Sequence, residues 1–170
     1  KMKYLLIIAL IFTTLTVSAH PDAAAASVAK PAACHYFGYE NAAKLLGTEV
    51  SADDGGMTED ATGRTWKCNF YAADKAVKDW PKLYFMLAKS SSADAAKGAF
   101  EAVRESNKKH KGFEEWPGVG DEAVVHTDDA NFHFVMVRKG ANSIRIKVNP
   151  ARGISLDAVK NAAEMLVAKM

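Results

Sequence analysis

The chain of 170 residues carries 22 basic and 20 acidic side chains, and 49% of its residues are hydrophobic. Its first 19 residues contain two of the basic side chains and no acid, so residues 20–170 carry 20 of each sign. Balanced charge gives no long-range attraction to nucleic acid or to an anionic membrane, and the composition therefore argues against both as partners.

A segment typical of a signal peptide lies near the N-terminus. Residues 4–17 (YLLIIALIFTTLTV) contain no charge, and this length of 14 residues matches the apolar core of a signal peptide. A membrane-spanning helix needs about 20 residues. Val17 and Ala19 supply the small side chains that signal peptidase requires. We therefore predict a signal peptide at residues 1–19, cleavage before His20, a secreted or periplasmic protein, and no membrane span after cleavage.

An alanine-rich leader, residues 20–33, follows the predicted cleavage point. It lacks large apolar side chains, so it cannot bury enough surface to offset the entropy lost on ordering, and we expect it to be disordered. Residues 34–170 are long enough for one hydrophobic core and are predicted to form a single α+β domain.

Two cysteines, Cys34 and Cys68, are present in the chain. In a secreted protein such a pair is most simply a disulfide. The bridge would close a loop of about 35 residues and contribute roughly 4 kcal/mol on the chain-entropy model. The alternative is a redox or nucleophilic thiol, which the absence of a Cys-x-x-Cys motif disfavours.

The first half of the domain is predicted to contain one helix and two strands. Residues 41–46 read as a short helix that ends at Gly47, and the polar residues 48–63 as a long surface loop. Residues 64–70 alternate apolar and polar side chains, as in a strand with one buried face. Residues 83–88 carry apolar side chains on both faces, which predicts a central strand covered on both sides.

The second half is predicted to contain a helix, three strands and a terminal helix. The first helix covers about residues 92–109, and the strands cover residues 123–127, 132–139 and 143–149. Ser155 caps the last helix, whose apolar residues repeat at helical spacing. The order α-β-β-α-β-β-β-α predicts an α+β fold with a single antiparallel sheet of about five strands and helices on one face.

The hairpin expected from the first two of these three strands carries two histidines. If the chain turns symmetrically at residues 129–130, His126 lies opposite His133. Asp128 then shares their face, and the three side chains are candidate ligands for a divalent metal, although a closed zinc site needs four ligands. The alternative is an exposed sheet face with ordinary polar residues.

Two tryptophans precede prolines at the ends of predicted loops. Trp80 and Trp116 are candidate ligand-binding residues, because half-exposed aromatic side chains line many ligand grooves. The alternative is that both rings only cover the edge of the core.

Several short motifs in residues 34–169 follow one another in an order that is also found in small secreted bacterial proteins. They are Cys34 before a helix ending in Leu45-Leu46-Gly47, the strand Cys68-Asn69-Phe70, the turn of residues 117–123 (PGVGDEA), and a terminal amphipathic helix. On these motifs the chain resembles domain-of-unknown-function families, particularly actinobacterial lipoprotein-like ones. The resemblance implies an extracytoplasmic α+β domain and no catalytic residue. Cys34 lies too far beyond the apolar segment for lipidation, so the chain departs from those lipoproteins.

Known catalytic motifs are absent from the sequence: it has no Gly-x-Ser-x-Gly, Walker loop, His-Glu-x-x-His or Gly-x-Gly-x-x-Gly. The leading interpretation is therefore an extracytoplasmic, non-enzymatic binding or accessory domain for a small ligand or an envelope protein. One alternative is a metal-binding protein or metal-dependent enzyme that uses His126 and His133. Another is a structural or inhibitory domain that docks on a protein.

Overall fold

The computed structural model describes residues 33–73, 82–128, 130–149 and 153–170. The predicted signal peptide, the leader up to residue 32 and Trp80 lie outside these residues. Ala33, predicted as the last residue of the leader, instead begins the first helix and is fully buried.

The described residues form four helices and seven strands, more strands than the sequence predicts. In chain order they are α1 (Ala33–Phe37), α2 (Tyr39–Leu46), β1 (Val50–Asp60), β2 (Gly63–Ala72), β3 (Lys82–Ser90), α3 (Ala93–Asn107), β4 (Phe113–Glu115), β5 (Glu122–Asp128), β6 (Phe132–Lys139), β7 (Asn142–Asn149) and α4 (Leu156–Val167). The predicted number of about five strands and the order α-β-β-α-β-β-β-α are therefore wrong. Strands β1 and β4 and the short helix α1 account for the difference.

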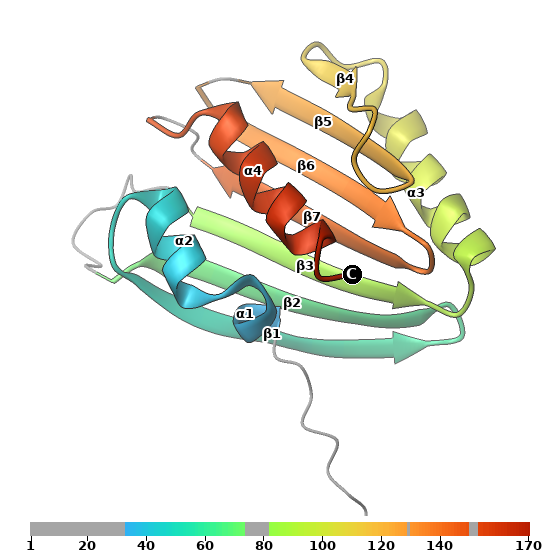
Figure 1. Cartoon of the computed structure of the whole chain (residues 1–170), viewed down its shortest axis with the longest axis horizontal. Coiled ribbons are helices and arrows are strands. Elements are labelled where there is room, and N and C mark those ends of the chain that lie inside the picture. The colour runs from blue at the N-terminus through green and yellow to red at the C-terminus, as the bar shows by residue number, and fades with distance from the viewer. Residues whose placement is uncertain (1–32, 74–81, 129, 150–152) are drawn as a thin grey trace, which may run out of the picture. The chain divides into compact units, whose positions relative to one another are not determined.

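All seven strands belong to one antiparallel sheet with the order β1-β2-β3-β7-β6-β5-β4 (Figure 1). Hairpins join β1 to β2 and connect β5, β6 and β7 in sequence. In the centre β3 pairs with β7, and the chain between them includes α3 and strands β4 to β6. Residues far apart in the sequence therefore become neighbours across β2, β3 and β7.

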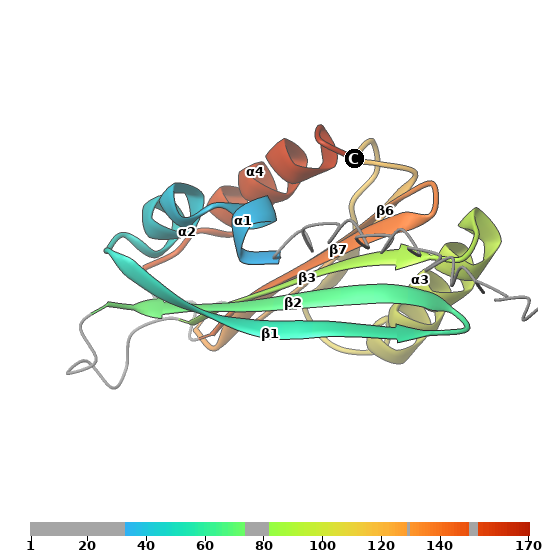
Figure 2. The same cartoon turned by 90° about the horizontal axis from the view of Figure 1, so that it is seen from below.

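The helices cover both faces of the sheet, which corrects the prediction that they lie on one face. Helices α1, α2 and α4 lie on one side, and α3 lies on the other (Figure 2). Phe100 of α3 is buried with Val124 and Met136 in a small second core. We refer to the side that carries α1, α2 and α4 as the core face, and to the other side as the α3 face.

The main core fills the space between the sheet and the three helices of the core face. The ring of Phe37 on α1 lies 5.4 Å from that of Phe70 and 5.2 Å from that of Phe85, measured between centroids. Every second residue of β2 from Trp66 to Ala72 is buried, which confirms the predicted alternation. β3 is central, as predicted, but its second face is only partly covered, because Tyr84 is 38% exposed.

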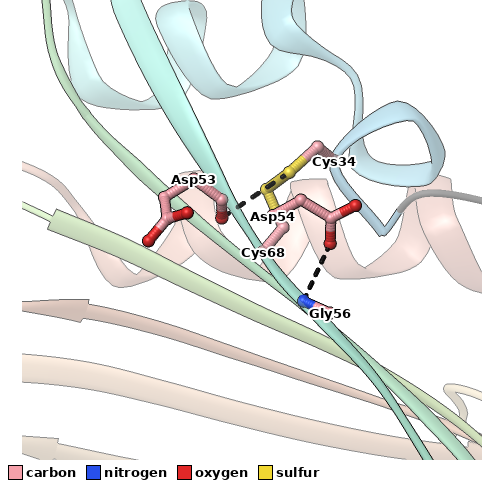
Figure 3. Close-up of a disulfide and its surroundings, with 5 residues drawn as sticks. All are labelled: Cys34, Asp53, Asp54, Gly56 and Cys68. Atoms are coloured by element: carbon pink, nitrogen blue, oxygen red, sulfur yellow. Dashed lines mark hydrogen bonds between the residues drawn. A yellow bond between two sulfur atoms is a disulfide. The ribbon is translucent and has the colours of Figure 1, made fainter.

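The predicted disulfide between Cys34 and Cys68 is present, and it fastens α1 to β2 with a Cα–Cα distance of 5.1 Å (Figure 3). Both cysteines are buried, and Cys34 Sγ lies 3.9 Å from the carbonyl oxygen of Asp53 on β1. The bridge is compatible with an oxidising, extracytoplasmic location. None of the described helices is long and apolar enough to cross a membrane.

Strand β1 replaces most of the surface loop predicted at residues 48–63, and it contains a bulge. Its register against β2 shifts between Asp54 and Met57, so that Gly55 and Gly56 stand opposite Lys67. Gly56 has a φ of 76°, and its N–H donates to Asp54 Oδ1 at 3.1 Å (Figure 3). A side chain at Gly55 would bring a Cβ to 2.9 Å from the Lys67 Cβ, so the two strands approach too closely for one.

Candidate functional site

A pocket of about 310 Å³ opens on the α3 face of the sheet, over strands β2, β3, β7 and β6. Alternate residues of a strand point to opposite faces, so the residues between the buried ones form most of this surface. We call it the basic pocket; it is lined by Lys67, Asn69, Tyr84, Phe85, Met86, Phe134, Arg145 and Lys147. Helix α3 does not line it, because Phe100 packs instead over Val124 and Met136.

Strand pairing arranges the lining side chains in two rows across the sheet. In one row Lys67, Met86 and Arg145 are direct neighbours on β2, β3 and β7. In the next row the neighbours are Asn69, Tyr84, Lys147 and Phe134 on β2, β3, β7 and β6. The cations of β2 and β7 therefore stand on either side of an apolar strip on β3.

The charge of the pocket is strongly unbalanced. Its lining includes three cations, Lys67, Arg145 and Lys147, and no carboxylate. The side chains come from two strands that are separate in sequence, so the balanced composition of the chain conceals a local concentration of positive charge. Such a surface attracts anions at short range, and the low-dielectric floor beneath it strengthens that attraction.

Arg145 is the most constrained of the three cations. Its side chain is half-buried, and this burial lowers the pKa of its guanidinium. Its guanidinium makes no hydrogen bond or ion pair with any residue that the structure describes. Arg138, on the neighbouring strand, shows the usual arrangement: its Nε lies 2.6 Å from Glu122 Oε2 and its Nη1 lies 2.8 Å from Asp121 Oδ2. Arg145 therefore presents an unused fork of donors to the pocket.

The floor of the pocket is mostly apolar. Met86 and Phe134 are half-buried, and Tyr84 is among the most exposed large hydrophobic residues of the described chain. Asn69 and the Tyr84 hydroxyl add neutral hydrogen-bonding groups at one end. The lining contains no histidine, cysteine, serine or carboxylate, so it offers none of the usual pairs of nucleophile and general base. The three cations of the lining suit this arrangement to binding an anion.

The predicted pairing of His126 with His133 is wrong. The structure pairs His126 with Phe134 and Thr127 with His133, so the two histidines lie on opposite faces of the sheet. Three residues separate the paired positions Asp128 and Phe132, whereas the symmetric turn places only two residues between paired positions. This one extra residue shifts the register by one residue. Asp128 remains on the face of His126, but the metal site loses its second histidine.

His133 instead has a structural role on the core face, where it is 3% exposed. Its Nδ1 lies 2.6 Å from Thr127 Oγ1, and its Nε2 lies 2.8 Å from the carbonyl oxygen of Ile154. Both ring nitrogens are therefore occupied by protein atoms. Among the described residues, no group of three or more His, Cys, Asp and Glu side chains is placed to hold a metal ion.

His126 lies beside the basic pocket in a small aromatic cluster. Its ring stacks on that of His110 at 5.6 Å and meets the Phe132 ring edge-on at 5.0 Å, and Lys147 Nζ lies 5.2 Å from the centroid of Phe132. His126 Nδ1 is 3.1 Å from Asn107 Oδ1 at the end of α3. These contacts hold the end of α3 against β5.

Acidification is expected to destabilise the protein through His126. Burial, followed by the charge of His110, lowers the pKa of His126 in the folded chain below the ordinary value of a histidine. As pH falls below that value, the unfolded chain binds a proton first, so the free energy of unfolding decreases. A His126→Gln variant should show a smaller fall in Tm between about pH 7.5 and about pH 5. An equal fall in the variant and the wild type would contradict this assignment.

Trp116 does not line the basic pocket. Trp116 is half-buried against the main core, on the opposite face of the sheet, with Lys160 Nζ 5.4 Å from its ring centroid. This position fits the alternative that the ring covers the edge of the core. Trp80 lies outside the described residues, and its predicted role stays a prediction.

Sequence reasoning missed the cations of the basic pocket as a group. Arg145 and Lys147 were recognisable as outward residues of a strand, but their approach to Lys67 depends on the pairing of β3 with β7.

Comparison with protein-family models and with curated proteins finds no match for this chain.

Proposed function

We propose that the protein is an extracytoplasmic, non-enzymatic binding domain that holds a small anionic ligand in the basic pocket. The observation that carries this proposal is the half-buried guanidinium of Arg145, which opens into the pocket without a carboxylate partner among the described residues. The predicted signal peptide supports a secreted or periplasmic location, and the Cys34–Cys68 disulfide is compatible with it. Membership of the secreted bacterial families that the motifs resemble would fit the same location.

An anion is expected to bind here because a partly desolvated cation without a partner costs free energy in the unliganded protein. An anion that reaches Arg145 gains two parallel hydrogen bonds from the guanidinium, and the ammonium groups of Lys67 and Lys147 add to the attraction. A pocket of about 310 Å³ lies at the lower end of the range for small-molecule sites. A small ligand therefore suits this surface better than a protein partner.

The proposal predicts that Arg145→Met weakens anion binding by roughly tenfold or more, because a hydrogen bond to a charged group contributes about 1.5–3 kcal/mol. Chemical shifts of the backbone amides would be followed by NMR while the secreted protein is titrated with phosphate, benzoate and octanoate. At least one anion should shift the amides of Lys67, Tyr84 and Arg145. Methionine keeps an unbranched apolar stem and removes the guanidinium, with its charge and its donors.

Arg64→Met provides a matched control. Arg64 is an exposed arginine of β2 that pairs with Glu59 at 2.8 Å, on the core face and outside the basic pocket. This variant should bind the anions as the wild type does. Equal weakening in both variants would show a general effect of net charge, and unchanged binding by Arg145→Met would remove the proposed site.

A further inference from the structure

The mixed lining of the basic pocket points to a narrower class of ligand, and we infer that this ligand is an amphipathic acid: an apolar chain or ring that carries one carboxylate or phosphate group. The inference rests on the proposed function. It adds that the apolar floor of the pocket takes part in recognition and that the ligand is bound as a free molecule.

Two cations of the basic pocket lie on either side of the apolar strip on β3. Lys67 and Arg145 are the direct neighbours of Met86 on its two sides. Neighbouring strands lie about 4.8 Å apart, so the two cationic residues are about 10 Å apart across β3. Long, flexible side chains at this separation can contact the same acid group above Met86 from both sides. One headgroup can therefore contact both cations at the centre of the pocket.

The rest of the ligand would lie on the apolar side chains beside these cations. Tyr84 follows Met86 along the same face of β3, and Phe134 lies one strand beyond Lys147 in the same row as Tyr84. Tyr84 is 38% exposed, so part of its side chain is open to solvent. An apolar body that continues from the headgroup covers this ring and removes apolar surface from water.

A simpler ligand interacts either with the cations of the pocket or with its apolar residues, but not with both. An inorganic anion pairs with Arg145 and leaves Tyr84 and Met86 in water. A neutral apolar molecule covers these residues but removes water from Arg145 without replacing its hydrogen bonds, which is unfavourable. An amphipathic acid matches both parts, and the planar guanidinium suits the paired oxygens of a carboxylate or phosphate.

Three matched probes test this inference on the secreted protein: octanoate, acetate as the acid group without the chain, and 1-octanol as the chain without the acid. In NMR titrations octanoate should bind roughly tenfold or more tightly than either of the others. Tyr84→Ser should weaken binding of octanoate and leave that of acetate unchanged. Arg145→Met should weaken binding of octanoate and strengthen that of 1-octanol, because 1-octanol then no longer removes water from a guanidinium.

The possible failures are distinguishable. If acetate, phosphate and octanoate bind equally at Arg145, the amphipathic class is wrong and the anion-binding function stands. If no anion binds, the proposed function fails as well. Sedimentation with phosphatidylglycerol vesicles separates the two sources of the same chemistry: binding to vesicles without binding to monomeric octanoate would overturn the inference in favour of a membrane surface.

Discussion

Removal of the Cys34–Cys68 disulfide is expected to lower the free energy of unfolding by about 4 kcal/mol. The two cysteines are 34 residues apart, and opening this loop restores entropy to the unfolded chain. The folded state also loses the covalent link between α1 and β2. Helix α1 has five residues and is too short to be stable without tertiary contacts. Urea unfolding of a Cys34→Ala/Cys68→Ala double variant, compared with the oxidised wild type, measures this loss.

Reduction of the wild type with dithiothreitol is the control, because it opens the loop without removing the sulfur atoms from the core. Reduced wild type and double variant should unfold at similar urea concentrations, both well below the midpoint of the oxidised protein. If the midpoints of reduced and oxidised protein coincide, the bridge does not restrain the unfolded chain as described.

Replacement of Phe85 by alanine is expected to lower the free energy of unfolding by about 3–5 kcal/mol. Phe85 is 2% exposed at the centre of the sheet, and its ring contacts two residues of α1. Its centroid lies 6.1 Å from that of Tyr36 and 5.2 Å from that of Phe37. The substitution leaves a cavity between the sheet and α1 that the backbone of a central strand cannot close. Thermal or urea unfolding gives the difference.

Tyr84→Ala is the matched comparison for this prediction. Tyr84 precedes Phe85 on the same strand and points to the opposite, partly exposed face. Its removal should change the free energy of unfolding by only about 0.5 kcal/mol. Similar losses for both variants would mean that the two faces of β3 are equally packed, against the structure.

Elements with strong local signals were predictable from sequence. Gly47 ends α2 with a φ of 70°, and Ser155 caps α4 by accepting a hydrogen bond at 3.1 Å from the N–H of Ala158. Both depend on residues within one helical turn. The alternation in β2 was equally clear, because one face of that strand is buried along the main core.

Strand β1 was not predictable, because its stability does not come from its own residues. It is an edge strand with many exposed side chains, and it contains aspartates and glycines that have low strand propensity. Its backbone is held by hydrogen bonds to β2. Alternating apolar and polar residues indicate a strand with one buried face, and β1 has few side chains that are even partly buried.

Long-range pairing explains the remaining differences. The apolar residues of α3 show that it has a buried side, but they do not show which face of the sheet it covers. His126 and His133 were predicted to share a face of the hairpin. They lie on opposite faces because the observed register differs from the predicted one by one residue. The candidate disulfide needed only a count of cysteines, whereas the basic pocket needed the pairing of β3 with β7.

The position of β1 at the edge of the sheet also bears on how copies of the protein meet. An open edge exposes unpaired backbone groups, which can pair with the edge of a second molecule and start aggregation. Here the edge strand carries four acids, Asp53, Asp54, Glu59 and Asp60, and is bent by the bulge at Gly55 and Gly56. Two copies that approach through β1 bring eight carboxylates together along an irregular backbone. The bend and the repulsion oppose self-association, and the repulsion weakens at high salt concentration.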